Sequence, residues 1–181
     1  SNGNTRDIIT ITAVVECDLL DFFSFWEGPI WNWPERYRRR VKIGVRSLQV
    51  GDEGGIRPDI TYSWVHKGRV KILIHLNEPA TRGSEISFVA QLDWPAKCLP
   101  LMRRDRAEEF VLQFGRPTEY ARYVVVLPAG HEASYEAVGL NWGAGCHDLV
   151  SELNTLGQVE VGFTACDIPA DHRMGMRIDL K

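Results

Sequence analysis

Apolar residues recur at every second position along much of this chain, a pattern typical of strands that bury one face. Residues 86–92 and 159–165 alternate in this way over their whole length. The same signal, strengthened by β-branched side chains, predicts further strands over residues 8–15, 41–45, 110–114 and 176–180. Residues 123–127 are apolar at every position, so both faces of that strand would be apolar. We therefore expect it to lie centrally in its sheet, covered on both faces.

One hairpin can be predicted in detail from its two apolar faces. Ile60, Tyr62 and Trp64 precede a turn. After it, every second residue from 72 to 76 is apolar: Ile72, Ile74 and Leu76. If Trp64 opposes Ile72, all six apolar side chains share one face, because opposed residues of an antiparallel pair point the same way. This register predicts a three-residue loop over residues 67–69.

Helical signals are few. Residues 18–26 carry apolar side chains at i, i+3, i+4 and i+7, and Gly28 and Pro29 follow them, so the spacing predicts a short helix. Residues 146–156 are the best helix candidate, with Gly157 placed to end it. Residues 103–109 are expected to add a helical turn.

About ten strands, with turn signals between many of them, and two or three short helices predict a mainly β fold with a small α+β margin. We expect an antiparallel β-sandwich or a strongly bent sheet. Residues 1–3 are typical of a scar left by tag removal, so the prediction is one β-rich domain over residues 4–181, cut from a larger protein. Neither an internal repeat nor a linker is visible in the sequence.

The charge balance narrows the classes of partner. A net charge of −3 and an isoelectric point near 6.0 provide no long-range positive field, which argues against nucleic acid. The longest run without Asp, Glu, Lys or Arg, residues 137–147, is shorter than the ~18 residues that a membrane-crossing helix needs. We therefore expect no membrane span, and a protein or a small-molecule ligand as partner.

The four cysteines, Cys17, Cys98, Cys146 and Cys166, lack C-x-x-C spacing, and the chain contains no N-x-S/T sequon. This distribution favours a cytoplasmic location. Two disulfides in a secreted domain remain the alternative, and four cysteines would allow three pairings.

Cys146 is the candidate nucleophile of an enzyme. It follows Gly-Ala-Gly at the start of the predicted helix, where backbone N–H groups and the helix dipole would stabilise a thiolate. His172 is the candidate base, and the carboxylate that orients it would come from Asp171, Asp148 or Asp167.

Residues 143–156, together with His172, resemble the papain-like thiol hydrolases, the transglutaminase type among them, in which Gly-x-Cys opens a helix and a His follows on a later strand. The resemblance implies a cysteine hydrolase or acyltransferase that uses Cys146 and His172. A zinc site built from Cys146, His147, Cys166 and His172 is disfavoured because the spacing lacks paired ligand knuckles. We expect no metal and no cofactor.

Residues 22–40 combine half of the tryptophans with the densest basic run of the chain. Aromatic rings beside arginines can stack on a partner's surface, and this makes the segment the preferred binding surface. Its candidate binding residues are Trp31, Trp33, Arg36, Arg38, Arg39 and Arg40. The alternative is that the aromatic residues fill one end of the core while the arginines are solvated.

Two functional hypotheses follow. The first is a non-catalytic, ligand-sensing or protein-binding β module of a larger protein. The alternative is the papain-like cysteine hydrolase or acyltransferase that uses Cys146 and His172.

Overall fold

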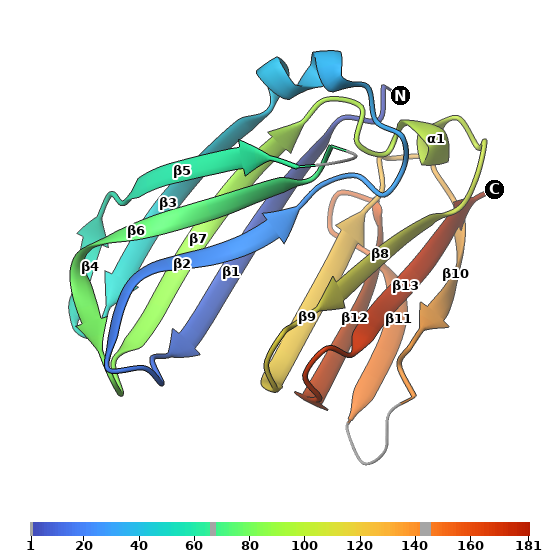
Figure 1. Cartoon of the computed structure of the whole chain (residues 1–181). Coiled ribbons are helices and arrows are strands. Elements are labelled where there is room, and N and C mark those ends of the chain that lie inside the picture. The colour runs from blue at the N-terminus through green and yellow to red at the C-terminus, as the bar shows by residue number, and fades with distance from the viewer. Residues whose placement is uncertain (1, 66–67, 142–145) are drawn as a thin grey trace. The chain divides into compact units, whose positions relative to one another are not determined.

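The computed structural model describes residues 2–65, 68–141 and 146–181. These residues form thirteen strands, all paired antiparallel, and two short helices (Figure 1). The prediction of a mainly β, antiparallel fold is thus confirmed. Neither of the two described helices is long and apolar enough to cross a membrane.

The chain divides into two compact units, residues 1–99 and residues 100–181. Each unit has its own pair of sheets, so the two are described separately below. The sequence showed no linker between them. The expectation that residues 4–181 fold cooperatively as one domain stays a prediction.

Unit 1 is built from seven strands and one short 3₁₀ helix, η1. One sheet has the order β1-β7-β3-β4 and the other the order β2-β6-β5. The elements are β1 (Thr5–Val14), β2 (Leu19–Glu27), η1 (Glu35–Arg40), β3 (Lys42–Val50), β4 (Glu53–Ile56), β5 (Asp59–Trp64), β6 (Val70–Thr81) and β7 (Glu85–Trp94).

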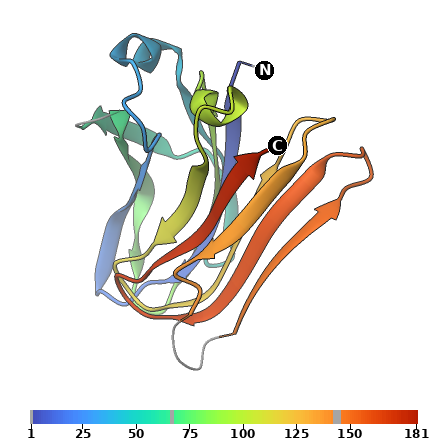
Figure 2. The same cartoon turned by 90° about the vertical axis from the view of Figure 1, so that its right-hand side faces the viewer.

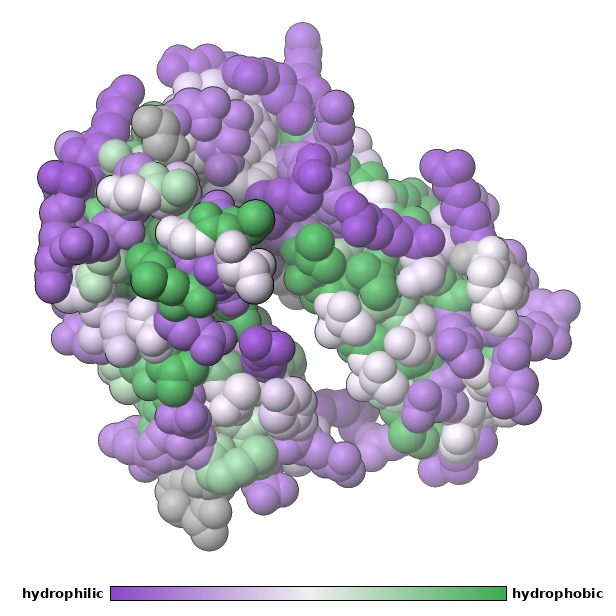
Figure 3. All heavy atoms as spheres, turned by 180° about the vertical axis from the view of Figure 1, so that it is seen from behind, coloured by the Kyte–Doolittle hydropathy of each residue, from purple (hydrophilic) through white to green (hydrophobic). Residues whose placement is uncertain are grey.

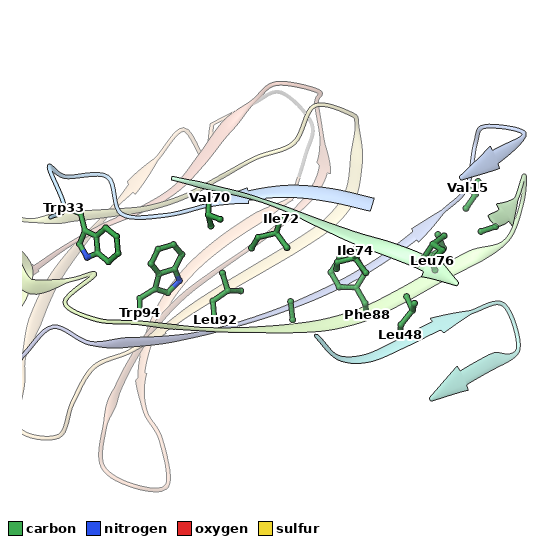
Figure 4. Close-up of a cluster of buried hydrophobic side chains, with 13 residues drawn as sticks. Val15, Trp33, Leu48, Val70, Ile72, Ile74, Leu76, Phe88, Leu92 and Trp94 are labelled. Carbon is green, nitrogen blue, oxygen red and sulfur yellow. The ribbon is translucent and has the colours of Figure 1, made fainter. Parts of the chain in front are cut away.

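The core of unit 1 lies between these two sheets (Figure 4). Alternate residues of β6 and β7 are buried, as their sequence pattern predicted. Phe88 on β7 packs against Phe23 and Phe25 on β2, with ring centroids 5.2 and 6.1 Å apart. Because the rings come from different sheets, these contacts hold the two layers together.

The β5–β6 hairpin has the predicted faces but not the predicted register. Tyr62 opposes Ile72 and Trp64 opposes Val70, and the Val65 N–H donates to the carbonyl of Arg69 (2.8 Å). The register thus differs from the prediction by two positions, since Trp64 opposes Val70 and not Ile72, and residues 66 and 67, in the predicted turn, lie outside the described residues. A shift by an even number of positions keeps each side chain on its face, which is why the apolar faces still match.

Unit 2 is built from six strands after the single helical turn α1 (Leu99–Met102). Its sheets have the orders β10-β13-β8 and β11-β12-β9 (Figure 2). The strands are β8 (Glu108–Gln113), β9 (Thr118–Val126), β10 (Ala133–Val138), β11 (His147–Leu153), β12 (Val159–Ile168) and β13 (Arg173–Leu180).

The core of unit 2 combines alternate residues of β12 with nearly every second residue of β13. Phe110 on β8 meets Tyr123 on β9, from the other sheet, with ring centroids 6.1 Å apart. Gly175 permits β13 to approach β8 closely, because an added Cβ would lie 2.1 Å from the Phe110 carbonyl oxygen. A side chain at this position would separate the two strands.

Both units have the same connectivity. When β4 is set aside, each unit has six strands, and in each the third, sixth and first strands form one sheet while the fourth, fifth and second form the other. By this order, β5 corresponds to β11 and β6 to β12. The two units thus repeat the same strand topology. The alternating apolar pattern of the sequence did not predict this repeat.

Both principal helix predictions were wrong. Residues 18–26 form most of β2, and residues 146–156 contain β11. In β2 the inward residues Phe23 and Phe25 alternate with the outward Phe22 and Trp26, so aromatic residues on both faces imitate helical spacing. Residues 103–109 continue from α1 into bends and β8, and β9 is an edge strand, not a central one.

We expect Phe88→Ala to lower the free energy of unfolding of unit 1 by about 3–5 kcal/mol, because it removes the ring that packs between the two sheets and leaves a cavity there. Ile8→Ala, on the solvent face of β1 with 57% of Ile8 exposed, should change it by less than about 0.5 kcal/mol. Urea unfolding followed by tryptophan fluorescence measures both, since five of the six tryptophans belong to unit 1. Equal losses in the two variants would contradict this placement of the core.

Candidate binding surface

An aromatic cluster closes one end of the unit 1 sandwich. Trp33 lies 5.9 Å from Trp64, 5.8 Å from Trp94 and 5.7 Å from Tyr37, measured between ring centroids. Its indole N–H donates to the Pro95 carbonyl (2.9 Å), and only 3% of the residue is exposed. The ring of Trp33 is therefore part of the core, and its role as a partner contact stays a prediction that this burial does not support.

Trp31 anchors the same segment a short distance away. It is half-buried, and its indole N–H donates to the Lys97 carbonyl (2.6 Å). Together the two tryptophans attach the segment before η1 to residues 95–97. This attachment fixes where the arginines of η1 lie.

A buried ionic cluster lies beneath this segment. The Lys97 ammonium contacts the Asp7 carboxylate at 2.6 Å and the Glu27 carboxylate at 2.5 Å, and it lies 5.4 Å from the Trp94 ring centroid. Burial raises the pKa of Asp7; the Lys97 charge opposes this shift, and the neighbouring Glu27 carboxylate adds to it. The cluster joins the start of β1, the end of β2 and the segment after β7.

The arginines of η1 divide between internal contacts and solvent. Arg38 pairs with Glu35 (2.9 Å) and stacks over the Trp64 ring. Arg36 and Arg40 both lie over the Tyr37 ring, with 5.2 and 5.8 Å between guanidinium carbon and ring centroid. Arg36, Arg39 and Arg40 are exposed, and among the described residues none of them pairs with a carboxylate.

Two more cations lie at this end of unit 1. Arg69 and Lys71, at the start of β6, lie over the ring of Trp26 at 6.0 and 5.7 Å. Trp26 is 48% exposed on the outer face of its sheet. We name a set of five cations that form no ion pair with a carboxylate in the described structure the basic end: Arg36, Arg39, Arg40, Arg69 and Lys71.

The two ends of the unit 1 strands carry different sets of charged residues. Here β2, β5 and β7 end while β3 and β6 begin, and Figure 1 shows η1 beside these strand ends. The nearby acidic groups are already engaged, because Asp7 and Glu27 pair with Lys97, Glu35 with Arg38 and Asp93 with Arg6. The turns at the opposite strand ends carry acidic residues: Glu16, Asp18, Asp52, Glu53 and Glu85.

Two shallow hollows lie on outer sheet faces, and neither resembles a small-molecule site. One, of about 130 Å³, lies over Gly162 between Arg122 and Asp148; the other, of about 230 Å³, lies over Gly44 between Arg46 and Asp93. Ligand pockets usually have volumes of roughly 300–1,000 Å³. In the rear view of Figure 3, hydrophilic residues cover much of the surface and apolar residues gather in patches between them.

The catalytic hypothesis required a free thiol on Cys146 and a helix that begins there, and the structure shows a disulfide and a strand. Cys146 forms a disulfide with Cys166, with 5.2 Å between their Cα atoms, and a strand rather than a helix follows it. Residues 143–145 lie outside the described residues. His172 Nε2 donates to the Gly139 carbonyl (2.7 Å), and the Asp171 N–H donates to the Phe114 carbonyl (2.7 Å). The roles proposed for His172 and Asp171 stay predictions that now lack a thiol nucleophile.

No group of three or more His, Cys, Asp or Glu residues converges to hold a metal ion within the part of the chain that the structure describes. Cys146 and Cys166, two of the zinc ligands considered, are bonded to each other.

Each of the two units consists of two antiparallel sheets. Comparison with family models, curated proteins and solved structures found no match. Function is therefore inferred from the geometry of the two units.

Sequence reasoning missed several members of this surface. Asp7, Glu27 and Lys97 are distant in sequence and meet only through strand pairing. Arg69 and Lys71 reach Trp26 because Trp26 opposes Lys71 across the β2–β6 pair. The alternating pattern of β6 predicts Lys71 on the outer face, but it does not reveal the neighbouring strand.

We expect Trp33→Ala to lower the free energy of unfolding by about 3–5 kcal/mol, since it removes the centre of the aromatic cluster. Trp26→Ala should cost less than about 1 kcal/mol, because nearly half of its surface already faces water. Urea denaturation measures the two variants side by side. A loss for Trp26→Ala as large as that for Trp33→Ala would show Trp26 to be structural.

Lys97→Met should lower the free energy of unfolding by about 3–5 kcal/mol at neutral pH, because the two half-buried carboxylates of Asp7 and Glu27 lose their buried counter-charge. Asp7→Asn should cost less, because Lys97 keeps Glu27 as its partner.

The pH dependence of Asp7 has a defined sign. Its pKa is raised by folding, so the native state binds this proton more tightly than the unfolded chain does. Its contribution to stability is therefore present below the unfolded pKa and falls as pH rises through the interval up to the raised value. Asp7→Asn should flatten this slope in urea titrations at several pH values, and an unchanged slope would contradict the assignment.

Proposed function

We propose that the chain is a non-catalytic, protein-binding β module, and that unit 1 binds an acidic segment of a partner protein through the basic end. The observation that carries the proposal is a cluster of cations without carboxylate partners, whereas the acidic side chains at the same end are already paired. Elsewhere on the described surface, arginines such as Arg82 and Arg177 form ion pairs with carboxylates. Cations without partners retain their full attraction for an incoming anionic surface.

The surroundings of the basic end favour a protein partner over other anions. Trp26 and Ile30 are 48% and 53% exposed there, so apolar contact area accompanies the charge. Aromatic residues and arginine are enriched in protein interfaces. The net charge of −3 and the acidic turns at the opposite strand ends oppose a long polyanion such as nucleic acid.

The attachment of the segment before η1 supports a preorganised surface. Trp31, Trp33 and the Lys97 cluster hold it through hydrogen bonds and buried ion pairs. A surface that is already ordered loses less entropy when a partner binds.

A cytoplasmic location remains part of the proposal. In that location, the disulfide between Cys146 and Cys166 would be expected to form only transiently, because cytosolic disulfides are usually transient and either catalytic or redox-sensing.

Fluorescence anisotropy with a labelled 20-residue Glu-rich peptide tests the binding surface. Arg39→Glu combined with Arg40→Glu should raise the dissociation constant at least tenfold, because two charges are reversed and the net charge of the basic end changes by four units. The control, Arg57→Glu combined with Arg103→Glu, changes the net charge equally at exposed positions outside the basic end and should leave the constant within twofold.

Equal losses in the two double variants would contradict the proposed surface and indicate only a response to net charge. Tighter binding of a 20-base-pair DNA duplex than of the peptide would contradict the choice of an acidic protein segment.

A further inference from the structure

The disulfide of unit 2 lies where an edge strand begins. Cys146 directly precedes β11, and its carbonyl accepts a hydrogen bond from the Cys166 N–H of β12 (2.9 Å). The two cysteines continue the register in which His147 opposes Ala165, so the bond links directly opposed positions of neighbouring strands. Cys146 is exposed and Cys166 is half-buried, which leaves the bond accessible from solvent.

Side-chain burial contributes little to holding β11 in place. Of its seven residues, only Leu149 is even partly buried, and Val150 and Leu153 are 48% and 70% exposed. The neighbouring β12, by contrast, buries Val161 and Phe163 completely or almost completely. As the edge strand of its sheet, β11 is held by backbone hydrogen bonds on one side alone.

The other end of β11 is fixed by a tight turn. The Asn154 N–H donates to the Gln158 carbonyl (2.9 Å), and the Asn154 side-chain oxygen accepts hydrogen bonds from the N–H groups of Leu156 and Gln158. Its amide group also donates to the Glu160 carboxylate (2.9 Å). The turn and the disulfide therefore clamp the two ends of a strand that has little packing between them.

From these observations we infer that Cys146–Cys166 is a thiol–disulfide exchange site whose co-substrate is a dithiol, and that its redox state controls whether β11 remains paired with β12. A thiolate of the dithiol attacks the exposed Cys146 sulfur, breaks the S–S bond and releases the Cys166 thiolate. The second thiol then attacks the mixed disulfide and releases the Cys146 thiolate. The dithiol leaves as its cyclic disulfide, two electrons pass to the protein, and both cysteines take up protons to the extent that their pKa values allow.

Reduction opens β11 from its first residue, because the clamp at that end is covalent only in the oxidised state. The turn at residues 154–158 stays in place, so the strand remains tethered at its other end. The backbone groups of β12 that pair with β11 over residues 159–165 then become a free sheet edge, which an extended peptide could join. This inference concerns unit 2 alone and does not depend on the proposed binding surface of unit 1.

Hydrogen exchange measured by mass spectrometry tests the inference on the full chain carrying Cys17→Ser, which removes the exposed free thiol. The protein is oxidised with glutathione disulfide, and peptide mapping without reductant should recover the Cys146–Cys166 link. Dithiothreitol, used as the dithiol, should accelerate amide exchange in residues 147–153 at least tenfold. Cys146→Ser combined with Cys166→Ser should reproduce that rate without reductant.

The matched control is β10, which is also an exposed edge strand of unit 2 but carries no cysteine. Its exchange should change by less than twofold. Unchanged exchange in β11, or the absence of the link from the oxidised protein, overturns the inference. Faster exchange in β10 and β13 along with β11 also overturns it, because the disulfide would then stabilise the whole unit.

Discussion

Burial of alternate side chains between two antiparallel sheets is the constraint on which both units depend. In unit 1, Phe88 meets Phe23 and Phe25 across the gap between the sheets, and in unit 2 Phe110 meets Tyr123. Each sheet can bury only one face, so its outer face and its strand ends are left for other interactions. The basic end and the exposed disulfide both lie at such positions, where side chains are free of packing requirements.

The basic end shows how a core can support a surface. Trp33 and Trp94 complete the apolar interior, while backbone carbonyls at residues 95 and 97 accept the indole hydrogen bonds of the segment before η1. The Lys97 ammonium contacts both the Asp7 and the Glu27 carboxylate and so offsets one of the negative charges that lie near the arginines. Core and surface are therefore coupled, since the groups that stabilise this end also leave its exterior positively charged.

The strands of both cores could be predicted because inward and outward positions differ in polarity. The alternation in β7 and β12 predicted their buried faces and most of their length. The prediction failed where polarity did not alternate: β2 carries aromatic residues on both faces, and the apolar residues of β11 are on the surface. Of the six candidate binding residues, Arg36, Arg39 and Arg40 are exposed, whereas Trp33 is core. The Lys97 cluster and the disulfide depend on strand pairing between distant residues, which no local pattern encodes.

The repeated connectivity places β5 and β11 in equivalent positions, each as an edge strand beside the fifth strand of its six. Unit 1 retains its edge strand through Trp64, whose ring packs between Trp33 and Trp94. The strand β11 contains no tryptophan, and a disulfide joins the residue before it to β12. Equivalent edge strands are thus held by aromatic packing in unit 1 and by a disulfide in unit 2. Because only a disulfide can be cleaved by a reductant, the edge strands of the two units differ in their sensitivity to the redox potential of their surroundings.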